Sequence, residues 1–140
     1  MTPGPDERRP ARQHVGSGSP YEPAIGFSRA VRVGDRVVVS GTGPVLAGGG
    51  CPAGAGPQAR RCWEIVAAAL AEAGASLDDV VRTRMYLTSA ADAEAVGAVH
   101  RELLGAARPA ATMVVVAGLL DPAWKVEVEA EAVVPPQALP

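Results

Sequence analysis

The chain has 140 residues, of which 48% are hydrophobic, 20% charged and 4% aromatic, and its formal net charge is -2. This length and hydrophobic content fit one domain with a real core and are too small for two. The charge offers no basic stripe for phosphate backbones, and few rings are present to stack on bases, so a nucleic acid partner is not expected.

The two cysteines predict no disulfide framework and no metal site. Cys51 lies in a Gly/Pro-rich stretch and Cys62 in a helical pattern, and neither belongs to a metal-ligand spacing. No segment reaches the roughly 18 apolar residues that a membrane span needs, and the N-terminus has no apolar signal core. We expect reduced thiols in a cytoplasmic protein without a metal or a membrane partner.

The beginning of the chain predicts a tail followed by a hairpin. Residues 1–20 mix Pro, Gly, Ser and charges without an apolar period, which indicates a flexible N-terminal tail in which His14 is a bystander. Residues 27–41 hold two short alternating or β-branched runs around Gly34-Asp35, which predicts a β-hairpin. The folded domain is expected over residues 21–135, with 136–140 as a C-terminal tail.

The middle of the chain predicts a loop and two helices around a strand. Residues 42–56 are a Gly/Pro-rich connection, either a mobile lid or slack. Apolar positions three and four residues apart predict an amphipathic helix over 57–74, opened by a proline and closed by a glycine. A strand is expected over 80–88, and a second helix from the Ser89 capping signal to Gly105.

Two further strands are expected near the C-terminus. ATMVVVAGLL (111–120) is nearly all apolar and predicts a buried strand. In KVEVEAEAVV (125–134), the apolar side chains alternate with Glu127, Glu129 and Glu131, so one strand face is apolar and the other acidic. The strand at 80–88 likewise separates Val81, Thr83, Met85 and Leu87 from Arg82, Arg84 and Tyr86.

The order ββαβαββ predicts an α/β fold of the α+β type, a two-layer sandwich in which both helices cover one face of a sheet of four or five strands. The other face would carry the three glutamates and the two arginines, together with apolar residues of the fourth strand. Such a mixture is unlike a plain solvent face and favours an interface between subunits with polar sites set into it.

Three segments resemble the reactive intermediate deaminase family, also called Rid or YjgF and endoribonuclease L-PSP-like. They are IGFSRAVRVGDRVVVSG (25–41), QARRCWEIVAAALAEAGASLDDVVRTRMYLTS (58–89) and RPAATMVVVAGLLDPAWKVEVEAEAVV (108–134), and the likeness covers residues 21–134. The resemblance implies a chorismate-mutase-like fold, a homotrimer with a central barrel, and ligand pockets between adjacent subunits. It also implies hydrolysis of enamines and imines, with release of ammonia and without any cofactor.

The sequence departs from the family at several pocket positions, which indicates a divergent subgroup. The arginine that clamps the substrate carboxylate in deaminating members is replaced by Ala111, and a methyl group cannot make that charge-assisted pair. The family's pocket Tyr, Asn and Cys fall on Phe27, Gly97 and Met113. The acid that positions or activates water is kept as Glu127. The expected substrate-binding residues are Phe27, Ser40, Gly41, Arg84, Gly97, Ala111, Met113 and Trp124.

Two roles remain open for Glu127. Burial among apolar walls would raise its pKa and suit it to acid or base catalysis, whereas a nearby Arg84 would lower that pKa. A buried glutamate should therefore be paired with Arg82 or Arg84 or held by hydrogen bonds. Alternatively, Glu127 only closes a salt bridge between subunits.

The functional hypothesis is a trimeric enzyme in specialised metabolism. It would hydrolyse or tautomerise a small reactive imine, enamine or related intermediate that lacks the usual carboxylate, with water activated by Glu127. Backbone groups near Ser40, Gly41 and Ala111 would hold the polar atom of the substrate. The alternative is a trimer that binds a small molecule, or acts as a scaffold, without turnover. Ribonuclease activity is disfavoured because no pair of histidines and no basic groove is visible.

Overall fold

The computed structural model describes residues 11–136, which form one six-stranded sheet in the order β1-β2-β3-β6-β4-β5. Neighbouring strands are antiparallel except for β4 and β5, which are parallel and are joined through a helix. The strands are β1 (Arg12–Val15), β2 (Ala30–Val33), β3 (Arg36–Thr42), β4 (Val80–Leu87), β5 (Ala110–Val115) and β6 (Val126–Val133).

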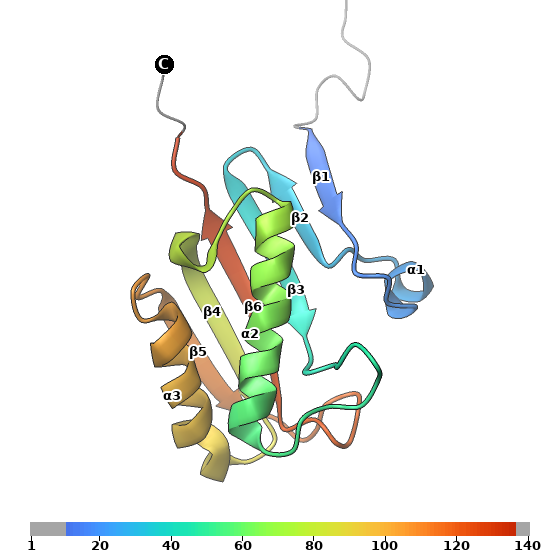
Figure 1. Ribbon diagram of the computed structural model, residues 1–140, viewed down its shortest axis with the longest axis vertical. Coiled ribbons are helices and arrows are strands. Elements are labelled where there is room, and N and C mark those ends of the chain that lie inside the picture. Colours follow the sequence, from blue (N-terminus) through green and yellow to red (C-terminus); the bar gives the residue numbers. More distant parts are fainter. Residues whose placement is uncertain (1–10, 137–140) are drawn as a thin grey trace, which may run out of the picture.

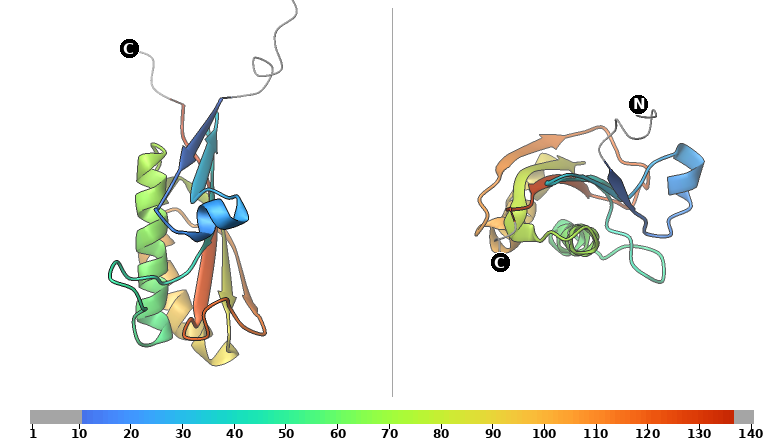
Figure 2. Two further views of the ribbon diagram at one scale, coloured as in Figure 1. Left: turned by 90° about the vertical axis from the view of Figure 1, so that its right-hand side faces the viewer. Right: turned by 90° about the horizontal axis from the view of Figure 1, so that it is seen from above.

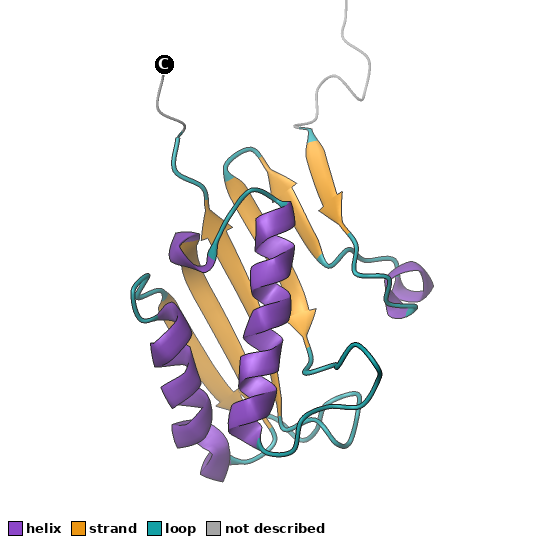
Figure 3. Cartoon of the chain, viewed as in Figure 1, coloured by secondary structure: helices purple, strands orange, loops and turns teal. Residues whose placement is uncertain are grey.

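Two helices cover one face of this sheet, and the other face is left open (Figures 1, 2 and 3). The covering helices are α2 (Ala55–Glu72) and α3 (Ala93–Leu104), and a third, short helix is α1 (Tyr21–Ile25). Short 3-10 turns lie at Leu77–Asp79 and Ala90–Asp92. The small helix α1 lies beside β1, away from the two covering helices (Figure 1). The predicted two-layer arrangement is therefore confirmed, with six strands instead of four or five. No helix within residues 11–136 is long and apolar enough to cross a membrane.

The first strand corrects the expectation of a flexible tail over residues 1–20. Residues Arg12–Val15 pair with β2, and the Val15 side chain, paired with Ala30, is only 4% exposed. Four residues with one buried apolar side chain give too short a pattern to be detected in the sequence, yet their backbone can extend an existing sheet edge. His14, in this strand, places Nδ1 3.0 Å from Ser28 Oγ. Residues 1–10 and 137–140 lie outside the described residues.

The predicted hairpin is confirmed, and its turn explains its glycine. β2 and β3 pair with Val33 opposite Arg36, which leaves Gly34 and Asp35 as a two-residue turn. Gly34 has a φ of 60°, the left-handed conformation that such hairpin turns favour and that glycine adopts without strain. The following strand, β3, is antiparallel to β6 and so brings the hairpin to the acidic strand.

The alternation along β6 is confirmed, and that along β4 needs one correction. Val126, Val128, Ala130 and Ala132 of β6 are buried beneath the helices, while its glutamates point to the open face. In β4, Thr83, Met85 and Leu87 are buried as predicted, but Val81 is 46% exposed and Val80 is buried in its place. The register between β4 and β6 shifts between Val80 and Arg82, and this bulge reverses the alternation at that end.

The expectation of a buried strand over 111–120 is wrong in length and in burial. β5 spans Ala110–Val115, and none of its residues is buried in the single chain. β5 has only one neighbour, β4, and is therefore the edge of the sheet. An apolar run shows that a strand avoids water but does not distinguish a core from a contact with another chain.

Candidate active site

A groove of about 1270 Å³ is lined by the end of β1, α1, the segment before β2, the end of β3 with the loop that follows it, one side of α2, the turn before β6 and the start of β6. Five of the nine predicted site residues line it. They come from separate parts of the chain, and are Phe27, Ser40, Gly41, Trp124 and Glu127. One chain therefore brings Glu127 and four of the predicted substrate-binding residues together in one groove.

A bulge at the end of β3 shapes the floor of the groove. The register of β3 against β6 shifts between Val39, opposite Ala130, and Thr42, opposite Val128. Ser40 and Gly41 lie in this irregular stretch. A Cβ on Gly41 would lie 3.0 Å from Glu127 Oε2, so the carboxylate approaches the backbone more closely than an ordinary side chain would allow. Bulges of this kind commonly redirect backbone next to active sites.

Ser40 is less available to a substrate than the sequence suggested. Its backbone N–H donates to Arg29 O at 3.0 Å, and its hydroxyl donates to Ser28 O at 2.6 Å. Both donors of Ser40 are therefore engaged in holding the bulge to the segment before β2. The expectation that backbone groups near Ser40 and Gly41 hold the polar atom of a substrate stays a prediction.

The Glu127 carboxylate has no hydrogen bond or ion pair with any group in residues 11–136. Its side chain is half-buried in the groove, next to Gly41. Burial raises the pKa of Glu127 above its ordinary value, the positive charge of Arg29 opposes this rise, and the negative charge of Glu129 adds to it. A carboxyl group with a raised pKa beside an open groove has the properties of a general acid or base.

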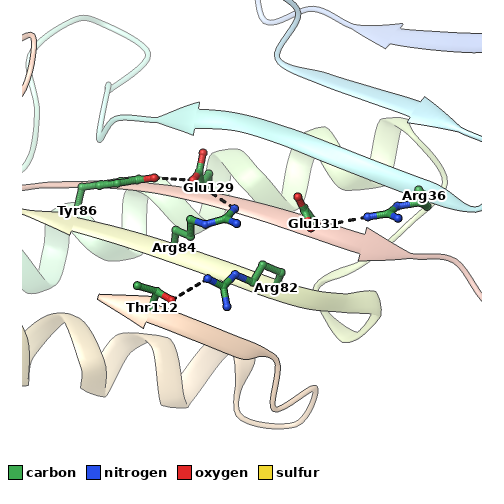
Figure 4. A network of polar contacts seen from close by, with 7 residues as sticks. All are labelled: Arg36, Arg82, Arg84, Tyr86, Thr112, Glu129 and Glu131. Carbon is green, nitrogen blue, oxygen red and sulfur yellow. Dashed lines mark hydrogen bonds and ion pairs between the residues drawn. The ribbon is translucent and has the colours of Figure 1, made fainter. Parts of the chain in front are cut away.

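Within the described residues, Glu127 makes neither the predicted pair with Arg82 or Arg84 nor the hydrogen bonds predicted as the alternative. Arg84 Nη1 lies 3.5 Å from Glu129 Oε1, which also accepts a 2.6 Å hydrogen bond from the Tyr86 hydroxyl. Arg82 Nη2 donates to Thr112 Oγ1 at 2.8 Å instead. Figure 4 shows these contacts on the open sheet face, with a further pair in which Arg36 lies 3.9 Å from Glu131. Arg84 therefore does not line the groove, since its place in the register is opposite Glu129.

The predicted site residues did not include Arg29, a cation that lines the groove together with Arg61. Arg29 immediately precedes β2, and its Nη2 donates to Gly41 O at 2.7 Å. The guanidinium lies over the ring of Phe27 with its carbon 5.7 Å from the ring centre, a cation–π distance. Burial lowers the pKa of Arg29, and the charges of Glu22 and Glu127 oppose that shift. Its spacing two residues after Phe27 could have flagged it, because alternate residues near a strand share a face.

Trp124 reaches the groove because a buried glutamine fixes the turn before β6. Gln58 of α2 is 2% exposed, its Nε2 donates to Pro52 O and to Ala123 O at 3.0 Å each, and its Oε1 accepts from the Lys125 N–H at 2.7 Å. These bonds connect the loop before α2 to the turn that carries Trp124. No sequence pattern marks this role, since a single glutamine in a helical pattern is usually exposed.

The remaining predicted site residues lie away from the groove. Gly97 of α3 faces Met113 of β5, whose Cε would lie 4.0 Å from a Cβ on Gly97. Ala111 and Met113 pair with Thr83 and Met85 of β4, so they lie on the helix-covered side of the edge strand. Strand β4 separates this group from β6 and Glu127. One chain therefore carries two groups of predicted pocket residues that it cannot itself bring together.

The chain is similar to a known protein family over most of its length. Residues 18–134 match the family model described as Endoribonuclease L-PSP. An uncharacterized protein of Streptomyces coelicolor is 42% identical over 126 residues, covering 87% of this chain and 92% of that protein. A RutC family protein of Pyrococcus abyssi is 34% identical over 100 residues, covering 66% of this chain and 75% of that protein.

Solved structures agree with this match. A Mycobacterium tuberculosis protein, Rv2704, described as a member of the YjgF/YER057c/UK114 family, is 44% identical with a TM-score of 0.82, covering 89% of this chain and all (100%) of that one. RidA from an Antarctic Psychrobacter is 28% identical with a TM-score of 0.74, covering 86% and 94%. Together with the six-stranded sheet and its covering helices, these matches establish that the chain belongs to the Endoribonuclease L-PSP family, also called YjgF or Rid, and has its chorismate-mutase-like fold.

Proposed function

We propose that this protein hydrolyses a small reactive imine, or the enamine in equilibrium with it, and that Glu127 activates the water. The observation that carries the proposal is the Glu127 carboxylate, half-buried beside an open groove, with a raised pKa and without an ion-pair partner in the described residues. A purely structural glutamate would be expected in an ion pair, as Glu129 and Glu131 are. Family membership supports the same reaction class.

The proposed reaction balances without a cofactor. Water attacks the carbon of the protonated imine while Glu127 accepts a proton from that water, and a neutral carbinolamine forms. Glu127 then returns the proton to the nitrogen, the carbon–nitrogen bond breaks, and the hydroxyl proton passes to the departing ammonia, so that a carbonyl compound and ammonium leave. A carboxyl group whose pKa lies above its ordinary value is suited to both steps, since it must take up and release the same proton.

The substrate is proposed to carry an apolar part and to need no carboxylate clamp. Exposed apolar side chains line the groove around the acid, among them Ile25 at 66% and Leu120 at 83% exposure. Position 111 offers only a methyl group, which cannot bind a carboxylate. An imine derived from a simple amine would therefore suit the groove better than one derived from a small amino acid.

We also propose that three copies assemble and complete each pocket. The open sheet face exposes Val38, Val114 and Val133 between its ion pairs, which is a surface suited to burial against another chain. Gly97, Ala111 and Met113 could approach the groove only from a second copy. Light scattering should give the mass of a trimer, and a monomer mass would contradict this part of the proposal.

The function is tested by ammonia release from imines generated in the assay. A flavin monoamine oxidase supplies imines without a carboxylate, and an amino-acid oxidase supplies imines with one. We expect wild-type protein to speed ammonia release and Glu127→Gln to abolish it. Glu131→Gln is the matched control, because it removes a carboxylate from the same face of β6 that is already paired with Arg36. Absence of catalysis with both series would refute the proposed hydrolysis.

A second experiment tests the absence of a carboxylate-binding arginine at position 111. Ala111→Arg restores a guanidinium at the position where the resemblance implies a carboxylate contact. If the groove acts on imines without a carboxylate, this substitution should leave those substrates unimproved and should favour imines from amino acids. Tight binding of the carbonyl products, combined with no turnover of either series, would support the alternative of a non-catalytic binding protein.

A further inference from the structure

Glu127 is the proton acceptor and donor of the proposed reaction. Arg29 and Glu127 both approach the same residue, Gly41. The Arg29 guanidinium donates to the carbonyl of Gly41 at 2.7 Å, and the Glu127 carboxylate lies over the Cα of that same glycine. All three residues line the same groove. Arg29 therefore holds the backbone unit against which the Glu127 carboxylate lies.

Other contacts restrict the guanidinium to this location. Its carbon lies 5.7 Å from the centre of the Phe27 ring. Its Nε is buried without a hydrogen-bond partner in the described residues. Arg29 itself is held by a backbone bond, since its carbonyl accepts the N–H of Ser40. A long side chain with these contacts loses much of its freedom and can act as a fixed charge.

The charged and titratable groups around Glu127 leave Arg29 as the cation that acts on it. Glu129 on the same strand, Tyr86 on β4 and Cys62 on α2 also interact with Glu127, and none of them supplies a positive charge. Arg84 is engaged by Glu129. Arg61, which also lines the groove, donates to Val45 O at 2.8 Å and lies 3.3 Å from Glu64. Glu22 faces Arg29 from α1 and competes for its charge.

We propose that Arg29 is the positioning residue for Glu127: it holds the Ser40-Gly41 bulge against the carboxylate and supplies the charge that favours the ionised, proton-accepting form. Without this cation, a half-buried carboxyl would hold its proton to higher pH and would be an acid when the water needs a base. The kinetic part of its test rests on the proposed function, and the part that measures ionisation does not.

The test measures the ionisation of Glu127 directly as well as its kinetic consequence. Carbon-13 NMR follows the carboxyl titration in wild type, Arg29→Gln and Arg29→Lys, with Glu127→Gln to assign the signal. Ammonia release is measured over the same pH range. The matched control is Arg32→Gln, which removes an arginine of β2 that likewise donates to a backbone carbonyl, in this case Ala73 O at 2.6 Å.

In Arg29→Gln, the carboxyl titration should move to higher pH. The acid limb of kcat/KM should follow it, with a loss of about tenfold on that limb, since an opposite charge nearby changes a carboxyl's ionisation by about this factor or more. Arg29→Lys should keep the wild-type titration but lower kcat, because an ammonium lacks the planar fork that fixes Gly41. Arg32→Gln should leave both unchanged.

An unchanged titration in folded Arg29→Gln, or an equal shift in Arg32→Gln, would overturn the proposal. If Arg29→Gln does not fold, Arg29→Lys decides: a wild-type titration with reduced kcat supports the positioning role, and wild-type kcat contradicts it. If no variant and no wild-type sample releases ammonia, hydrolysis is refuted, while the NMR titration still decides whether Arg29 controls the ionisation of Glu127.

Discussion

Gly43 offers a sharp test of how the groove wall is packed. Gly43 is buried and lies directly after β3, and the ring of Trp124 is stacked against it. A Cβ at this position would lie 2.6 Å from both Cη2 and Cζ3 of Trp124. Carbon atoms that are not bonded approach favourably to about 3.5–4.0 Å, so Gly43→Ala must displace the ring by about 1 Å.

This displacement should destabilise the protein by about 1–3 kcal/mol, the usual cost of overpacking. The free energy of unfolding is measured by urea titration with circular dichroism, at fixed protein concentration because assembly would also affect it. Gly48→Ala is the matched control in the same loop, since a Cβ there meets nothing within 4 Å. Trp124→Leu should relieve the clash, so Gly43→Ala should cost less in that background.

Equal stability of Gly43→Ala and Gly48→Ala would refute the stacking of Trp124 on Gly43. So would strict additivity of Gly43→Ala and Trp124→Leu, because residues in contact show a coupling free energy in a double-mutant cycle. In either case, Trp124 could no longer be treated as a fixed wall of the groove.

Three further predictions follow from the pKa directions. Glu127→Gln should stabilise the protein at pH 8 and not at pH 4, as measured by urea titration. The raised pKa of Glu127 in the folded state means that the native state disfavours the charged carboxylate, so the wild-type protein loses stability as pH rises. A gain in stability that does not depend on pH would contradict this. His100 lies 2.9 Å from Thr83 Oγ1, and burial lowers its pKa. The stability of the wild-type protein should therefore fall as pH drops below the pKa of an unfolded histidine, about 6.5, and His100→Gln should remove that pH dependence. The hydrogen bond to Glu129 raises the pKa of Tyr86, and Glu129→Gln should lower it, as measured by the absorbance of the phenolate; no change would mean that this bond does not form in solution.

Local patterns determined most of the fold, and they failed where the register shifts. The hairpin, the two long helices and the alternation along β6 follow from periodicity and turn residues, which act over a few neighbouring positions. β1 was missed because four residues with one buried side chain carry almost no pattern. Val81 was placed on the wrong face because a bulge, which the sequence does not mark, reversed the alternation at the start of β4.

The site divides in the same way between sequence and tertiary structure. The sequence by itself determined that Glu127 lies on the polar face of a strand, and the resemblance pointed to Phe27, Gly41 and Trp124. Only the tertiary structure decided which cation lies near that acid: Arg82 and Arg84 are opposite other residues of the sheet, whereas Arg29 donates to the carbonyl of Gly41, the residue beside the Glu127 carboxylate. Periodicity fixes which face a side chain takes, but its neighbours depend on strand register, bulges and backbone bonds between segments far apart in the chain.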